Sequence, residues 1–128
     1  MKFPYFLFVV LISISARAED ACDKAFTTPE VNKCAEIDYR KSDKKLNVAY
    51  QDALRRMESW IEEPGQKKDT KQGLVEAQRL WVQFRDKDCG AIYDLWRDGT
   101  IRGAMYWGCM TAHTDTRAKE LDSFAQGR

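Results

Sequence analysis

The stretch that decides the fold covers residues 28–65 and reads TPEVNKCAEIDYRKSDKKLNVAYQDALRRMESWIEEPG. It opens with Thr28-Pro29-Glu30, which supplies a hydroxyl cap, a first-turn proline and an acid at the positive end of a helix. Mostly apolar residues then recur every three to five positions, which is the period of an α-helix; they are Cys34, Ile37, Ser42, Leu46, Tyr50, Leu54, Met57 and Ile61. The pair Pro64-Gly65 ends this pattern, so the stretch predicts one long amphipathic helix.

Two more helices are predicted downstream. We interpret the polar residues 66–72 as a connector or a frayed first turn. The second helix then carries a repeating face that consists of Leu74, Ala77, Trp81, Phe84 or Arg85, Cys89 and Ile92. After a turn at residues 97–100, a third helix begins near residues 102–104, and its repeating face consists of Cys109, Ala112, Arg117, Leu121 and Phe124. The sequence therefore predicts an all-α fold, a small antiparallel bundle of about three helices.

The first eighteen residues have the features of a cleaved export signal. A basic start at Met1-Lys2 precedes an apolar run over residues 3–15, and Ala16-Arg17-Ala18 supplies a signal-peptidase site. The run is too short to span a bilayer. We expect residues 1–18 to be a signal peptide and residues 19–128 to form a single helical domain without a membrane anchor, located in the periplasm or secreted.

Four cysteines lie in this expected mature part, and an even number in a small exported domain indicates two disulfides. In an up-down-up bundle Cys34, Cys89 and Cys109 share one end, which Cys22 also reaches. Three pairings are possible. We favour Cys34–Cys89 with Cys22–Cys109. Because zinc sites need closer cysteine spacing or partner histidines, and His113 is the sole histidine, we expect no metal and no cofactor.

The charge and the residue types exclude two broad functions. The formal net charge is +1, and loss of the bases Lys2 and Arg17 with the signal leaves the mature chain at −1. A nucleic-acid-binding protein needs a marked basic excess, so no nucleic acid is expected as a partner. A catalytic centre needs a nucleophile, a base and an orienting group. With His113 on a predicted polar face, we expect no enzyme.

A structural polar network is predicted between the first two helices. Asp43, Asn47 and Tyr50 share one face of the first helix, and Arg85 and Cys89 share one face of the second. If a disulfide brings these faces together, Arg85 pairs with Asp43 and hydrogen-bonds Asn47. The contact then fixes the register of the two helices.

Spaced motifs cover almost the whole mature chain. They are Cys22 with Glu30-x3-Cys34 and Tyr39, Ser42-Asp43-x2-Leu46-Asn47-x2-Tyr50, Ala77-Gln78-x2-Trp81-x3-Arg85-Asp86-x2-Cys89, and Cys109-x4-Thr114-x2-Arg117-x3-Leu121. In this order and spacing they resemble the LprI-like lysozyme-inhibitor domain, in which alanine usually stands at the position of Ser42. The resemblance implies an exported protein that binds and inhibits lysozyme and so protects the cell wall.

Two groups of residues are candidates for the contact with lysozyme or another peptidoglycan-acting enzyme. Glu62 and Glu63 lie at one end of the predicted bundle, whereas Tyr93, Trp96 and Arg97 lie at the other. Exposed aromatic side chains beside a charged turn are typical anchors of protein interfaces. Two alternatives stay open: an immunity or accessory protein for another envelope enzyme or secreted toxin, and a structural module of the envelope.

Overall fold

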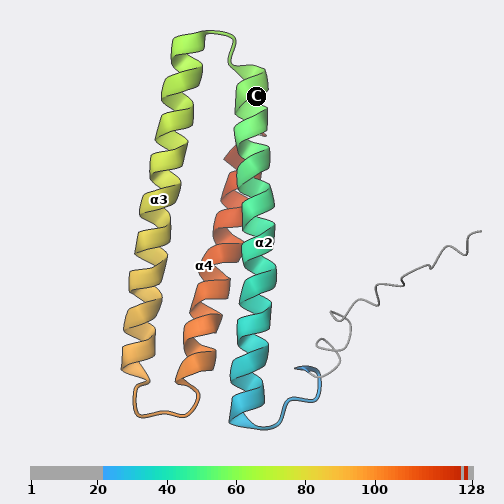
Figure 1. The fold of residues 1–128 in the computed structure, drawn as a ribbon, viewed down its shortest axis with the longest axis vertical. Coiled ribbons are helices and arrows are strands. Elements are labelled where there is room, and N and C mark those ends of the chain that lie inside the picture. Colours follow the sequence, from blue (N-terminus) through green and yellow to red (C-terminus); the bar gives the residue numbers. More distant parts are fainter. Residues whose placement is uncertain (1–21, 125, 127–128) are drawn as a thin grey trace, which may run out of the picture.

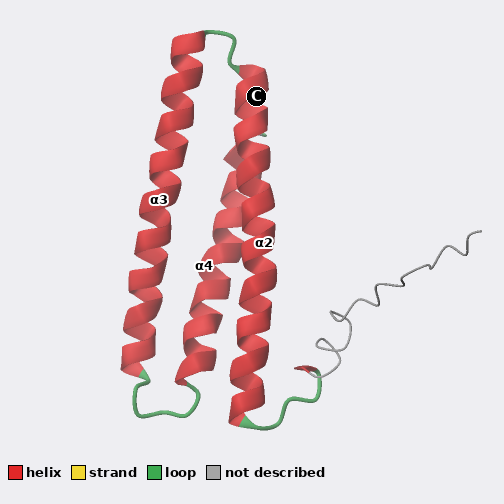
Figure 2. Ribbon diagram, in the orientation of Figure 1, coloured by secondary structure: helices red, strands yellow, loops and turns green. Residues whose placement is uncertain are grey.

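The computed structural model describes residues 22–124 and residue 126, and this part of the chain forms three helices. They are α2 (Thr28–Trp60), α3 (Pro64–Leu95) and α4 (Arg102–Phe124). Helices α2 and α4 run in the same direction, and α3 runs opposite to both (Figure 1). The described residues contain no strand (Figure 2). The predicted all-α bundle of three helices is confirmed.

Helix α4 is the central element of the bundle. It packs along α2 and also carries most of the contacts of α3, whereas α2 and α3 meet at few positions. The core lies mainly between α2 and α4 and consists of Leu46, Ala49, Ala53, Leu74 and Leu121. Because alanine side chains are small, Ala49 and Ala53 allow α4 to approach the backbone of α2 closely.

The start of α2 differs by one residue from the prediction. The hydroxyl of Thr27, not Thr28, caps the helix and accepts a hydrogen bond from the backbone N–H of Glu30 at 3.4 Å. The Glu30 carboxylate accepts in return from the backbone N–H of Thr27 at 2.9 Å. The cap lies at Thr27 because this reciprocal arrangement needs the acid three residues after the hydroxyl. The hydrogen bonds from the Thr27 backbone are the main cause that lowers the pKa of Glu30.

Residues 66–72, predicted to be a connector or a frayed first turn, are neither, because they form regular helix within α3. Glu63 caps this helix: its carboxylate accepts from the backbone N–H of Gly65 at 2.9 Å and from that of Gln66. Pro64 occupies the first helical position, where no intrahelical N–H bond is lost. The same residues that end α2 therefore begin α3 immediately.

The sequence predicted more inward-facing residues than the structure buries. On α3, where the sequence left Phe84 and Arg85 as alternatives, Arg85 is 6% exposed and Phe84 is 57% exposed. Ala77, Ala112 and Phe124 were predicted to face inward and are exposed. A bundle of three helices encloses a narrow core, so only a thin stripe of each helix is covered.

The two predicted disulfides are present, but the favoured pairing was wrong. Cys22 is bonded to Cys34, and Cys89 is bonded to Cys109. The pairing Cys34–Cys89 requires close contact of α2 and α3, which meet at few positions, whereas Cys89 of α3 lies against Cys109 of α4. One bridge therefore clips the N-terminal segment to α2, and the other joins α3 to α4. They close loops with sequence separations of 12 and 20 residues, for which chain entropy predicts about 3 kcal/mol of stabilisation each.

The expected signal peptide, residues 1–18, lies outside the described residues. Within the described ranges 22–124 and 126, none of the helices combines the length and the apolar character that crossing a membrane requires.

Removal of a core side chain tests the importance of the α2–α4 contact. Leu121 is 1% exposed, so Leu121→Ala leaves a cavity and is expected to lower the free energy of unfolding by about 2–5 kcal/mol. Val48 is 61% exposed on α2, and Val48→Ala is the matched control with an expected change within about 0.5 kcal/mol. Chemical denaturation of the oxidised protein measures both; equal losses would contradict this assignment of the core.

The cap of α3 gives a prediction about pH. Backbone hydrogen bonds, first from Gln66 and then from Gly65, lower the pKa of Glu63. A lowered folded-state pKa contributes stability above the unfolded-state pKa, and this contribution disappears as the pH falls through the folded-state pKa. Glu63→Ala is therefore expected to lower the Tm at neutral pH, and the difference from the native protein is expected to shrink in acid. Glu62→Ala, at the adjacent exposed position, is the control; a Glu63→Ala effect that is independent of pH would refute the ionised cap.

Candidate functional site

The turn between α3 and α4 is tightly hydrogen-bonded. The backbone N–H of Gly99 donates to the carbonyl of Trp96 at 2.8 Å, and that of Arg102 donates to the carbonyl of Gly99 at 3.3 Å. The backbone N–H of Arg97 donates to the carbonyl of Asp94 at 3.2 Å. Backbone hydrogen bonds within the turn therefore give it a defined shape.

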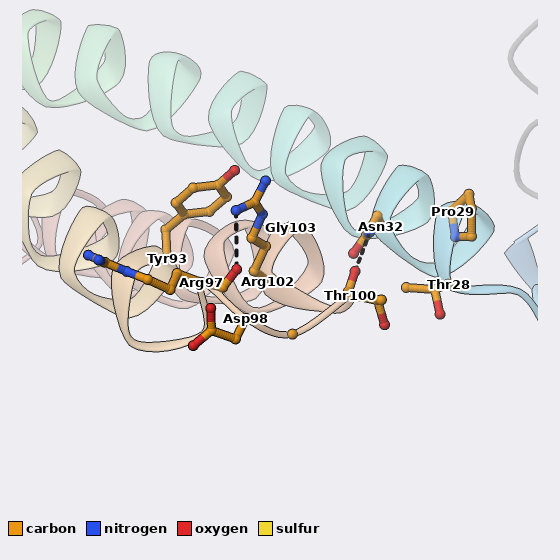
Figure 3. A pocket seen from close by; sticks show the side chains of 10 residues that line it. Thr28, Pro29, Asn32, Tyr93, Arg97, Asp98, Thr100, Arg102 and Gly103 are labelled. Atoms are coloured by element: carbon orange, nitrogen blue, oxygen red, sulfur yellow. Dashed lines mark hydrogen bonds between the residues drawn. The ribbon is translucent and has the colours of Figure 1, made fainter.

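Asn32 attaches this turn to the start of α2. Its side-chain amide donates to the carbonyl of Thr100 at 3.1 Å, and its side-chain oxygen accepts from the backbone N–H of Ala104 at 2.6 Å (Figure 3 draws the first of these bonds). A Cβ atom on Gly103 would lie 3.1 Å from the side-chain carbon Cγ of Asn32, so glycine permits this close approach. Sequence reasoning missed Asn32, because no local pattern links it to residues about 70 positions away.

An open hollow of about 650 Å³ lies between the turn and the first turn of α2 (Figure 3). Its lining combines polar and apolar surface and consists of Thr28, Pro29, Asn32, Tyr93, Arg97, Asp98, Gly99, Thr100, Arg102 and Gly103. The guanidinium of Arg102 lies 4.9 Å from the centre of the Tyr93 ring and covers one face of it. The hollow therefore forms part of the surface at this end of the bundle.

Large hydrophobic side chains gather at the same end of the molecule. Of the eleven that are exposed in the described part of the chain, six belong to the turn, the end of α3 or the start of α2. These six are Phe26, Val31, Tyr93, Leu95, Trp96 and Ile101. The predicted partial exposure of Tyr93 and Trp96 agrees with observed values of 37% and 38%. We call the six residues, together with Arg97, the turn-end surface.

The connection between α2 and α3, which contains the other two candidate binding residues, lies at the opposite end of the bundle (Figure 1). Glu62 and Glu63 belong to the connection between α2 and α3, and the 32 residues of α3 separate them from the turn-end surface by about 50 Å. Glu63 is already engaged as the cap of α3. One compact contact cannot include both groups.

A chain of aromatic ring contacts leads from the turn-end surface into the bundle. Arg102 covers Tyr93, whose ring meets Tyr106 edge-on with centroids 5.9 Å apart. Trp107 follows, with centroids 4.8 Å from Tyr106 and 5.1 Å from Tyr39. These contacts come from all three helices. They stiffen the end of the bundle at which the turn is mounted.

Arg85 ends this chain as a buried charge between two aromatic rings. Its guanidinium carbon lies 5.6 Å from the centre of the Tyr39 ring and 5.0 Å from that of Trp81. Burial raises the pKa of Tyr39, and the positive charge of Arg85 acts in the opposite direction. The cation therefore contacts ring faces on both α2 and α3.

Polar partners from the three helices complete the surroundings of Arg85. It donates to Asp86 at 3.0 Å and to the hydroxyl of Thr114 at 3.3 Å, and it lies 3.8 Å from Asp43. The predicted Arg85–Asp43 pair is thus placed together, although no disulfide joins α2 to α3. Asn47 donates to Asp43 at 3.5 Å, and the structure gives it no bond to Arg85.

Two further residues qualify the predicted network. Tyr50 is half-buried and packs against the hydrophobic core, which is an apolar role that its spacing alone did not indicate. Thr114, fully buried on α4, was not predicted as a partner of Arg85. A threonine inside an amphipathic helix gives no signal of its own, because its contact depends on which helix packs opposite.

The fold and this site define a class of protein: a small helical bundle, stapled by two disulfides, with a rigid turn presented at one end. The chain belongs to the LprI family, because the family model described as "Lysozyme inhibitor LprI" matches residues 18–121. The family resemblance predicted from the motifs is confirmed.

Relatives and a solved structure agree with this assignment. The chain is 32% identical over 107 residues to the uncharacterized protein R02472 of Rhizobium meliloti, covering 80% of this chain and 77% of the relative. It is 32% identical over 100 residues to the uncharacterized protein YecT of Escherichia coli, covering 73% of this chain and 62% of that protein. A crystal structure of a DUF1311 family protein from Pseudomonas putida has the same fold, with a TM-score of 0.67 at 23% identity, over 77% of this chain and 94% of that chain.

Truncation of Arg85 tests whether its cluster is structural. Arg85→Ala is expected to lower the free energy of unfolding by about 2–3 kcal/mol, because it removes the packing of the long side chain and the polar contacts among three helices. Arg79→Ala, at an exposed position of the same helix, is the control and is expected to cost less than about 0.5 kcal/mol. Thermal and chemical unfolding measure the difference; equal stability of the two variants would rule out the structural role.

Proposed function

We propose that the protein is an exported inhibitor that binds a lysozyme through its turn-end surface and blocks the substrate cleft. Membership of the LprI family supports an inhibitor rather than an enzyme. The observation that supports this location is that exposed Tyr93 and Leu95 at the end of α3 lie beside exposed Trp96 and Ile101 in the hydrogen-bonded turn that follows.

The rigidity of the turn favours inhibition. A loop that is ordered before binding loses little conformational entropy when it enters a cleft, so more of its contact energy appears as affinity. The bonds of Asn32 to Thr100 and Ala104 supply this order from α2. The ring chain from Tyr93 to Tyr39 supports the same end from within the bundle.

The charges of the turn suit the cleft of a glycoside hydrolase. Such a cleft contains a pair of carboxylic side chains on either side of the scissile bond. Arg97 carries a cation whose side chain is 67% exposed, with Asp94 3.8 Å away as its ion-pair partner within the described residues. In the proposed complex the guanidinium of Arg97 exchanges this loose contact for the carboxylates of the enzyme, while Trp96 supplies apolar contact beside it.

The disulfides support the proposed location outside the cytoplasm. Two bridges in a small domain are typical of proteins that fold in the periplasm or after secretion, where thiols are oxidised. The walls that lysozyme attacks lie in the same compartments, so the proposed inhibitor and its target meet there.

Inhibition and its location are tested together. Oxidised protein, residues 19–128, is mixed with an animal-type lysozyme, a goose-type lysozyme and a bacterial muramidase, and the clearing of a peptidoglycan suspension is followed. Stoichiometric inhibition of at least one enzyme is expected. Trp96→Ala and Arg97→Ala are each expected to weaken it by about 10-fold or more, as for central anchors of an interface.

Glu62→Ala provides the matched control, because Glu62 is exposed at the far end of the bundle. This variant is expected to inhibit like the native protein, and the Tm of each variant verifies that it is folded. A loss of inhibition in Glu62→Ala with normal Trp96→Ala would move the contact to the other end. No inhibition of any of the three enzymes would overturn the proposal as a whole.

A further inference from the structure

A group of potential metal ligands surrounds the disulfide between α3 and α4. Cys109 and His113 are four residues apart on α4 and therefore share a face of that helix, and Cys89 faces them from α3. The two sulfur atoms and one ring nitrogen of His113 all lie within 4.8 Å of one another. Cys89 is fully buried, whereas Cys109 and His113 are partly exposed.

A carboxylate holds His113 in place. The Nε2 atom of its ring lies 2.7 Å from the Oδ2 atom of Asp88, and the ring meets Phe84 edge-on with centroids 5.5 Å apart. With Nε2 bonded to Asp88, Nδ1 is the nitrogen that is left for another partner. A carboxylate that bonds the second nitrogen of a histidine is the usual outer partner of a zinc-binding histidine.

We propose that reduction of the Cys89–Cys109 disulfide converts this group into a zinc site with Cys89, Cys109 and His113 as ligands. Asp88 orients the histidine as the outer partner, and a water molecule completes four ligands, the arrangement of two thiolates and one imidazole that zinc accepts. In the oxidised protein the sulfur atoms are bonded to each other, so the site exists in the reduced protein alone.

The chemical step needs a dithiol as reductant. Its thiolate attacks the sulfur of Cys109, the less buried of the two cysteines, and breaks the bond to Cys89, which leaves as a thiolate and takes up a proton. The second thiol of the reductant then releases Cys109 and completes the reductant's own disulfide. The two electrons of the dithiol thus reduce the bridge to two thiols, and Zn²⁺ binding as two thiolates releases two protons to the solvent.

The geometry requires only small movements. Zinc–ligand bonds of about 2.0–2.3 Å at tetrahedral angles place neighbouring ligand atoms about 3.5–3.8 Å apart. The sulfur atoms therefore separate after reduction, and the histidine nitrogen moves inward by at most about 1.3 Å from the observed limit of 4.8 Å. Contacts of α3 with α4 outside the bridge, such as the bond of Arg117 to Gln78 at 3.0 Å, keep the two helices together.

The second disulfide provides an internal comparison. Within the described residues, no histidine or carboxylate forms a comparable group of three ligands with Cys22 and Cys34. Two double variants therefore separate a built site from ordinary chelation by two thiols. Cys22→Ser/Cys34→Ser retains the proposed site, and Cys89→Ser/Cys109→Ser removes it.

Both double variants are reduced with a phosphine, which does not compete as a thiol ligand, and are titrated with Co²⁺ and Zn²⁺. The Cys22→Ser/Cys34→Ser chain is expected to bind one Co²⁺ with a thiolate charge-transfer band and to show a higher Tm with Zn²⁺. On this background Asp88→Asn is expected to weaken Zn²⁺ binding by about 10-fold, and His113→Ala by more, as measured by competition with a chromophoric chelator.

Three results would overturn the proposal. The first is equal metal affinity of the two double variants, which would indicate chelation by any pair of thiols. The second is no binding by Cys22→Ser/Cys34→Ser after reduction. The third is unchanged affinity in His113→Ala, because the imidazole would then not be a ligand.

Discussion

The packing of α4 against α2 is the contact on which the rest of the structure depends. Leu46, Ala49 and Ala53 form the surface of α2 against which Leu121 of α4 is almost completely buried. Helix α3 has few contacts with α2 and is held mainly through α4, by the Cys89–Cys109 bridge and neighbouring polar contacts. A single domain of three helices has a small core. The disulfides therefore supply a substantial part of its stability.

Arg85 shows how such a small core accommodates a charge. Its side chain is 7% exposed, but the carboxylates of Asp43 and Asp86 beside it are 40% and 51% exposed. The charge is thus neutralised by two carboxylates that remain partly solvated, so the desolvation of these acids costs little free energy. Its contacts with Tyr39, Trp81 and Thr114 come from three helices, so the residue fixes their mutual register.

The family motif and the proposed binding surface are different parts of the molecule. Asp43, Trp81, Arg85 and Cys89 belong to the motif, and the structure uses them to join helices. The turn-end surface lies beyond them, at residues 93–101 and the start of α2. Under the proposed function, the motif residues hold the bundle together and the turn makes the contact with the partner. It also means that membership in the family supports the class of function more directly than the identity of the lysozyme.

The sequence by itself determined the helices, because helical periodicity and capping act between residues close in the chain. The period of residues 34–61, the ending at Pro64-Gly65 and the start near Arg102 all correspond to the observed elements. Local chemistry also explains the two helix starts that differ from the prediction. Thr27 with Glu30 caps α2 one position before the predicted cap, and Glu63 with Pro64 begins α3 where a connector or a frayed turn was predicted. The exposure of Tyr93 and Trp96 followed from their place beside a turn. Only the tertiary structure decided the disulfide pairing, the burial of Arg85 rather than Phe84, and the link from Asn32 to the turn. Each of these depends on which helix faces which. That arrangement arises from the packing of α4 against both α2 and α3, and the spacing of residues within a single helix does not specify it.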